Sequence, residues 1–216
     1  MSMRLISVNV GLPRAVQWKG NTVTTGIYKQ PVAERVALRA HNLEGDGQAD
    51  LSVHGGADKA VYLYPAEHYA FWRREFPDTE LPWGMFGENL TTEGLLESTA
   101  HIGDRLRIGS AVVRITEPRI PCYKLALRFK RVDVVKRFLA SARSGFYAAV
   151  EQAGEVQAGD ALTLLSRDGL GLTVADITRI YAHAKDDLAT LQRAVQHPEL
   201  SAGWRDYFQE RLGRLR

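Results

Sequence analysis

The sequence contains very little cysteine. Cys122 is the only thiol among 216 residues, which excludes an internal disulfide and a structural zinc site built mainly from thiolates. One cysteine also cannot hold an iron–sulfur cluster. No apolar run approaches the roughly 18 residues of a membrane-spanning helix. Residues 1–11 lack the long apolar region and the cleavage site of a signal peptide, so we expect a cytoplasmic protein with no membrane partner.

Neither sign of charge dominates the chain as a whole. Twenty-eight lysines and arginines oppose 25 aspartates and glutamates, a net charge of +3. Between His101 and Arg143, however, eleven basic residues oppose only three acidic ones, so this stretch carries 11 − 3 = +8. Such a concentration is typical of a solvated basic face, or of a site that holds a phosphate or a nucleic-acid backbone.

The pattern of hydrophobic residues predicts a mainly β fold. Short β-branched segments separated by Gly, Pro and Asp fill the first two-thirds of the chain, which favours a barrel or a sandwich over alternating βαβ units. Helical periodicity adds two interspersed helices, one opened by Pro65 and one starting at Asp133. The expected strands cover residues 4–10, 22–28, 32–40, 59–64, 105–108, 111–116, 146–151 and 161–165.

The last fifty residues have a different pattern. Three short amphipathic segments predict three helices, and Thr173 with Asp176 forms a capping pair for the first of them. Basic and acidic residues cancel over this region, which argues against a DNA-binding function. We therefore predict a β-barrel domain over residues 1–167 and a three-helix extension over residues 168–216.

Cys122 is the leading candidate for chemistry. Pro118 and Pro121 end the preceding strand and stiffen the loop, so we expect the thiol to be presented rather than buried. Arg119 and Lys124 lie close in sequence, and neighbouring cations favour the thiolate. A thiolate acts as a nucleophile or as a soft metal ligand. The residues alone leave both roles open, beside that of a small buried hydrophobic side chain.

A second candidate segment contains His54, Gly55 and Gly56, followed by Lys59. Paired glycines allow backbone N–H groups to approach a ligand closely and to point at an anion. His54 and Lys59 add a donor and a fixed positive charge on either side. A Gly-Gly pair is also common in ordinary turns. Taken by itself, this segment therefore gives anion binding only as a hypothesis.

A third candidate pair is Glu88 and Asn89. A carboxylate beside an amide can position a polar heterocycle or orient another ligand, although the same residues occur in loops that enter strands. Asp46 and Asp50 lie in a glycine-rich segment, and we interpret them as turn formers rather than as a catalytic pair.

These segments occur in an ordered set that resembles the MOSC family, the domain at the C-terminus of molybdenum-cofactor sulfurases, and specifically its stand-alone YiiM-like members. The likeness covers about residues 3–166, and the helical tail is similar to the extension of those members. The motifs are Thr25-Gly26-Ile27-Tyr28-Lys29 followed by Pro31-Val32, Gly45-Asp46-Gly47-Gln48-Ala49-Asp50, His54-Gly55-Gly56, Asp58-Lys59-Ala60-Val61, Phe86-Gly87-Glu88-Asn89-Leu90, Ile102-Gly103-Asp104, Pro118-Arg119-Ile120-Pro121-Cys122, Gly145-Phe146-Tyr147 and Ala158-Gly159-Asp160.

The resemblance implies a barrel-like fold that binds molybdenum cofactor, a mononuclear molybdenum held by a pterin dithiolene, and no pyridoxal phosphate. It implies that the thiolate of Cys122 ligates the metal. Cations and backbone donors suit the phosphate of the cofactor. Within the matching motifs we therefore expect cofactor contacts from His54, Gly55, Gly56, Lys59, Asn89 and Arg119, besides Cys122.

Relatives of this type reduce N-hydroxylated compounds, including hydroxylaminopurines, to amines, and we expect the same small-molecule substrates here. Two electrons would come from a separate reductase, because the chain shows no flavin, haem or iron–sulfur motif. His54 or Glu88 are the candidate proton relays beside Cys122. The sequence leaves both a monomer and a homodimer open.

Three other functions stay open. A cofactor carrier or sulfur-transfer module would use the same residues without turnover. A cysteine hydrolase would pair Cys122 with His54, but no third orienting residue is evident. The basic stretch motivates a nucleic-acid-binding module, although we expect no nucleic-acid partner.

Overall fold

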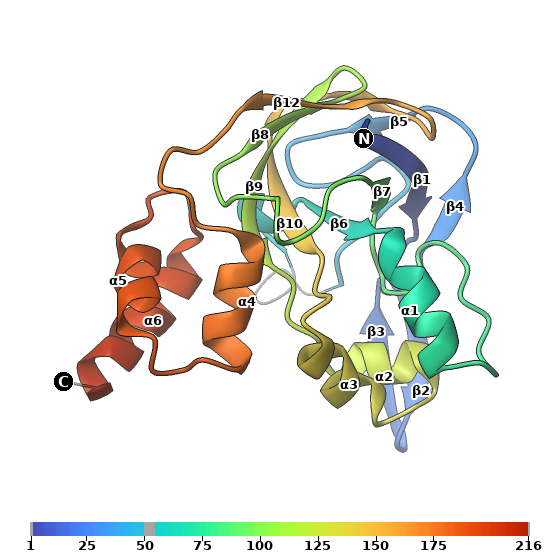
Figure 1. The fold of residues 1–216 in the computed structure, drawn as a ribbon. Coiled ribbons are helices and arrows are strands. Elements are labelled where there is room, and N and C mark those ends of the chain that lie inside the picture. The colour runs from blue at the N-terminus through green and yellow to red at the C-terminus, as the bar shows by residue number, and fades with distance from the viewer. Residues whose placement is uncertain (1, 50–54, 216) are drawn as a thin grey trace.

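One large sheet dominates the computed structural model, which describes residues 2–49 and 55–215 (Figure 1). Its eight strands are β1 (Arg4–Val10), β4 (Gln30–Val32), β6 (Val61–Pro65), β7 (Leu90–Glu93), β8 (Arg105–Ile108), β9 (Ala111–Pro118), β10 (Phe146–Gln152) and β12 (Leu162–Ser166). They are ordered β12-β8-β9-β10-β6-β7-β1-β4. Neighbouring strands are antiparallel, except that β6 and β7 are parallel.

Two small sheets and six α-helices complete the fold. The small sheets pair β2 (Arg14–Trp18) with β3 (Asn21–Thr25) and β5 (Val36–Leu38) with β11 (Gly154–Val156). The helices are α1 (Glu67–Glu75), α2 (Tyr123–Phe129), α3 (Val134–Ser141), α4 (Val174–Ala182), α5 (Leu188–Gln196) and α6 (Ala202–Leu215), with a short 3₁₀ turn at Ala57–Lys59. Within the described residues, no helix has the length and apolar character needed to cross a bilayer.

The structure does not confirm a closed barrel. Across residues 2–49 and 55–215 the strand order is open, and β12 and β4 form its two edges. Strand β1, the neighbour of β4, still contacts the segment just before β12, because the Leu5 N–H donates to the Asp160 carbonyl at 2.8 Å and the Gly159 N–H donates to the Leu5 carbonyl at 2.8 Å. This contact stops at the start of β12, whose remaining residues pair with β8. The fold is therefore mixed and sheet-dominated.

The predicted elements agree best with the structure where the hydrophobic alternation is regular. The strands over 4–10 and 105–108 have the predicted bounds. Pro65, predicted to open a helix, is instead the last residue of β6, and α1 begins at Glu67. Helix α2 was not predicted, because its seven residues include two basic ones and give only a weak periodic signal.

Helices α1, α2 and α3 lie together beside the sheet in Figure 1 and enclose an aromatic cluster. Trp72 of α1 stacks on Phe138 of α3 with ring centroids 5.7 Å apart. Its indole N–H donates to the Tyr64 hydroxyl at 2.7 Å, and the Tyr64 ring stacks on Phe86 at 4.5 Å. Stacked, hydrogen-bonded rings of this kind hold one another in a defined geometry.

Helices α4, α5 and α6 form a separate group in Figure 1 but share a core with the sheet. Thr173 and Asp176 form the predicted capping box at the start of α4. Ile115 of β9, Ile177 of α4 and Phe208 of α6 are fully buried members of one hydrophobic cluster. The extension is therefore packed onto the sheet. The division at residue 168 into two domains stays a prediction.

We expect Gly145→Ala to destabilise the protein far more than Gly159→Ala. Both glycines have positive φ, +59° and +94°, so each alanine carries a left-handed backbone cost of about 1–2 kcal/mol. A Cβ at Gly145 would also lie 2.5 Å from the Leu63 carbonyl oxygen, whereas nothing lies within 4 Å of one at Gly159. The overpacking adds about 2 kcal/mol. Urea unfolding of both variants measures the difference, and equal losses would contradict this packing.

Candidate functional site

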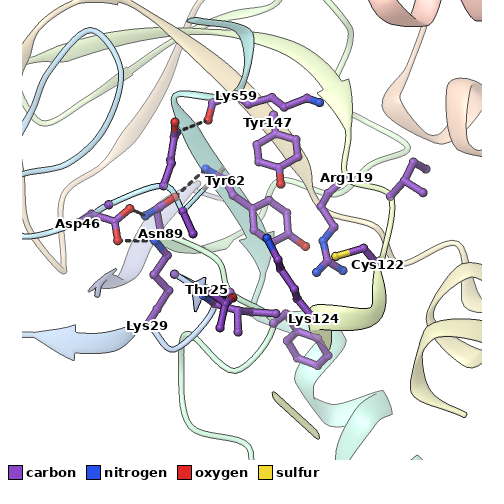
Figure 2. Close-up of a pocket in the computed structure, with 18 residues that line it drawn as sticks. Thr25, Lys29, Asp46, Lys59, Tyr62, Asn89, Arg119, Cys122, Lys124 and Tyr147 are labelled. Atoms are coloured by element: carbon purple, nitrogen blue, oxygen red, sulfur yellow. Dashed lines mark hydrogen bonds and ion pairs between the residues drawn. The ribbon is translucent and has the colours of Figure 1, made fainter. Parts of the chain in front are cut away.

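Cys122 lies at a cavity that is bordered by the ends of several strands (Figure 2). The segment that follows β9 contributes Arg119 and Cys122, β6 contributes Tyr62, and β10 contributes Tyr147. The thiol is half-buried, and its sulfur points toward the Arg119 guanidinium in Figure 2. The cavity therefore presents a soft sulfur ligand beside a cation.

Arg119 is buried, with a relative exposure of 6%. Its guanidinium lies 5.6 Å from the ring centroid of Tyr62 and 4.9 Å from that of Phe138. The Nη1 atom has no hydrogen-bond partner, and no carboxylate in the described part of the chain forms an ion pair with this side chain. Buried donors normally have acceptors. The unsatisfied donor therefore marks a place where an anion would complete the site.

Two tyrosines form the wall behind Arg119. The rings of Tyr62 and Tyr147 lie 5.2 Å apart. Burial raises the pKa of the Tyr147 hydroxyl to about 12, against the opposing effect of the Arg119 cation. Burial also raises the pKa of Tyr62 well above 10, and its hydroxyl donates to the Ser144 carbonyl at 2.7 Å. Both hydroxyls are therefore protonated near neutral pH and act as hydrogen-bond donors.

Members of the basic stretch have different surroundings in the structure. Four of its arginines form ion pairs with five carboxylates, four of which lie outside the stretch, and these cations are largely neutralised. Arg119 and Lys124 line the cavity instead, joined there by Lys59 from outside the stretch. The ion pairs are Arg105 with Glu151 and Glu199, Arg114 with Asp58, Glu151 and Glu199, Arg131 with Asp133, and Arg137 with Glu75 and Asp133.

A buried ion pair between Lys29 and Asp46 supports another wall of the cavity. Asp46 also accepts hydrogen bonds from the Gly11 N–H at 2.9 Å and from the Asn89 amide at 2.9 Å. The Asn89 Oδ1 atom accepts from the backbone N–H of Tyr62 at 3.1 Å. Burial lowers the pKa of Lys29, and Asp46 opposes this shift. Asn89 lines the cavity as the sequence suggests, while its amide connects the cavity walls.

Sequence reasoning missed several of these residues. Asp46, interpreted as a turn former, is the buried counter-charge of Lys29. Lys29 and Tyr147 both lie in motifs that carry the family resemblance, so a transfer of every polar residue in those motifs would have found them. Tyr62 lies outside those motifs, and its place at the cavity follows only from the pairing of β6 with β10.

The structure does not bring Glu88 to the cavity. This carboxylate is fully buried and accepts hydrogen bonds from the Tyr69 hydroxyl, the Gly84 N–H at 2.8 Å, the Phe86 N–H at 3.0 Å and the Thr91 hydroxyl at 3.0 Å. Burial raises its pKa. Through these contacts Glu88 stabilises the turn that places Phe86 at the cavity.

The His54-Gly55-Gly56 segment lies elsewhere. His54 and Asp50 are outside the described residues. Gly55 and Gly56 line a second cleft, between the sheet and the helical extension. Lys59 lines both the cavity and this cleft, and its ammonium lies 3.5 Å from the carboxylate of Glu117.

Disrupting the Lys29–Asp46 pair should strongly destabilise the fold. Asp46→Asn leaves a buried ammonium without its counter-charge, which costs about 3–5 kcal/mol. Lys29→Met combined with Asp46→Asn removes both charges, so we expect the double variant to be more stable than Asp46→Asn alone. The free energies of unfolding of Asp46→Asn, Lys29→Met and the double variant are compared in a double-mutant cycle. Additive losses would show that the two side chains do not interact.

The chain matches known families over both of its parts. The MOSC domain family matches residues 50–163, and the YiiM-like, 3-alpha helix domain family matches residues 172–214. The crystal structure of YiiM from Geobacillus stearothermophilus superposes with a TM-score of 0.82 at 37% identity, covering 97% of this chain and 99% of that one.

Two curated relatives extend these matches. The YflK protein of Bacillus subtilis (strain 168) is 43% identical over 211 residues, which are 98% of this chain and 95% of that protein. A protein of Gibberella moniliformis (strain M3125 / FGSC 7600) described as a reductase is 34% identical over 182 residues, which are 83% of this chain and 32% of that protein. The fungal protein is therefore about three times as long as the matched region.

Proposed function

The chain belongs to the MOSC domain family, and we propose that it is a molybdenum-cofactor-dependent reductase that converts N-hydroxylated compounds to amines. The observation that carries the proposal is the placement of Cys122 beside Arg119, a buried cation with an unsatisfied donor. MOSC domains are associated with molybdenum cofactor binding, and the similarity to a fungal protein described as a reductase supports the redox assignment.

The residues at the cavity fit this cofactor. A thiolate such as that of Cys122 is a ligand that soft metal centres prefer, and a dithiolene supplies further sulfur ligands. Among residues 2–49 and 55–215, no group of three His, Cys, Asp or Glu side chains converges on a metal position. Arg119 and Lys124 suit the phosphate of the pterin, because guanidinium and ammonium groups bind phosphate oxygens by charge-assisted hydrogen bonds.

The overall reaction is R–NH–OH + 2 e⁻ + 2 H⁺ → R–NH₂ + H₂O, in which the N–O bond breaks and the nitrogen is reduced. When bound, the cofactor supplies the two-electron redox chemistry. Cys122 would hold the metal, while Arg119 and Lys124 would orient the cofactor. Tyr147 keeps its proton at Oη and donates a hydrogen bond into the site. The electrons would come from a separate reductase.

A carboxyl group near Lys59 is a candidate for proton delivery. Burial raises the pKa of Glu117, and the adjacent Lys59 ammonium opposes this shift. A carboxyl group of raised pKa carries a proton closer to neutral pH than an ordinary glutamate does. Glu117, which lines the adjoining cleft, thus joins His54 as a candidate relay, whereas Glu88 lines neither the cavity nor the cleft.

Measuring bound molybdenum and bound pterin distinguishes the roles proposed for Cys122 and Arg119. We expect Cys122→Ala to lower bound molybdenum at least tenfold, because it removes the protein's thiolate ligand. Arg119→Met should lower bound pterin by about tenfold, the loss expected for a charge-assisted phosphate contact. Arg107→Met, on the exposed face of β8, is the matched control and should leave both unchanged. Metal and pterin analyses of protein from cells that make molybdenum cofactor provide the measurement.

Catalytic turnover is measured separately from cofactor content. Reduced, cofactor-loaded protein should be reoxidised by hydroxylamine and by 6-hydroxylaminopurine, with the amine as product. A loaded protein that neither compound oxidises would be a cofactor carrier instead. If the unsubstituted protein holds neither molybdenum nor pterin, Cys122 is to be tested as a hydrolytic nucleophile.

A further inference from the structure

We infer that the cleft between the sheet and the helical extension binds the planar ring of an aromatic N-hydroxylated substrate, and that α4 and α6 thereby select the substrate class. This inference rests on the proposed function and deepens it. The cleft is distinct from the Cys122 cavity but adjoins it, because Lys59, Ile120 and Tyr147 line both. A substrate in the cleft would therefore have its reacting end directed to the cavity.

One wall of the cleft is aromatic. Tyr181 of α4 and Trp204 and Tyr207 of α6 line it. The Tyr181 ring packs edge-on against Trp204 at 5.2 Å and lies 5.7 Å from Tyr207. Trp204 is buried, whereas Tyr207 is 39% exposed. Mutual packing holds these rings in place, so they can receive a planar ring at a small entropic cost.

Part of the remaining lining is polar. Gly55 and Gly56 belong to it, and so does Glu117, which has a relative exposure of 4%. Lys59 and Ser201 both stabilise the charged form of Glu117. A buried carboxylate accepts hydrogen bonds from N–H groups. Aromatic rings and an N–H acceptor in one cleft suit a nitrogen heterocycle that bears an amino or hydroxylamino group, such as a purine.

This arrangement gives the two cavities different tasks. The Cys122 cavity, with Arg119 and Lys124, has the charge for an anionic cofactor, whereas the cleft has aromatic rings and a carboxylate. A neutral aromatic base suits the cleft better, because the extension adds three aromatic side chains there beside the carboxylate. Substrates that lack a ring would reach the Cys122 cavity without using the aromatic wall.

Two glycines of α6 provide a matched test. A Cβ at Gly203, which lines the cleft, and a Cβ at Gly213, which does not, each meet nothing within 4 Å. Gly203→Leu therefore adds a side chain at the cleft from an unobstructed Cβ position, while Gly213→Leu makes the same helix-favouring change outside it. Circular dichroism and thermal melting confirm that both variants are folded.

Turnover is compared for a substrate with a ring and one without. Because one stacked base contributes roughly 1–3 kcal/mol, Gly203→Leu should raise the KM for 6-hydroxylaminopurine about tenfold or more. The kcat/KM for hydroxylamine should not change, and Gly213→Leu should match the unsubstituted protein with both compounds. If both variants have the same KM for the purine, the inference is overturned while the reductase function stands.

A binding measurement makes the inference independent of turnover. Adenine, the amine product, should bind the purified protein as measured by calorimetry or by quenching of tryptophan fluorescence. We expect its affinity to fall about tenfold in Gly203→Leu, which occupies space in the cleft, and in Tyr207→Ala, which removes a stacking partner. Absence of turnover with this selective loss would refute the reductase and retain the ring site. Absence of adenine binding at millimolar concentrations, or equal affinity in all variants, would refute the ring site.

Discussion

Pairing between β9 and β10 determines where the functional groups of this protein lie. The antiparallel register places Tyr147 opposite Glu117 and Phe146 opposite Pro118. Beyond the last pair, the Arg119 N–H donates to the Gly145 carbonyl at 3.3 Å. Gly145 is closely surrounded by β6, since a Cβ there would collide with Leu63 and Tyr64. One close approach of three strands thus positions Arg119 and, three residues later, Cys122.

The charges of the molecule are arranged around the same point. Glu199, just before α6, pairs with Arg105 and Arg114, and these contacts also join the helical extension to the sheet. Arg119 and Lys124 instead line the cavity and are not part of this network. Electrostatic energy in a protein depends on which partners are near. A basic segment of sequence therefore contributes partly to a structural ion-pair network and partly to the cationic lining of the cavity.

The helical extension contributes both to the core of the sheet and to the cleft. Its apolar faces complete the core of the sheet, through residues such as Ile177 and Phe208. The Tyr181 and Tyr207 side chains instead border a cleft that adjoins the Cys122 cavity. Packing on one face holds the other face in a constant position relative to the Cys122 cavity. The substrate-selecting role that we propose for the extension requires such a fixed position.

Local sequence patterns by themselves determined that strands dominate the first two-thirds of the chain, the bounds of two strands and the capping box of Thr173 with Asp176, because alternation and capping depend on neighbouring residues. The ordered motifs also determined the family and directed attention to Cys122. Only the tertiary structure decided that the sheet is open, that Asp46 is the buried partner of Lys29, and that Glu88 lies away from the cavity. The physical reason is that burial and pairing bring together residues such as Lys29 and Asp46, or Glu199 and Arg114, which no local pattern connects.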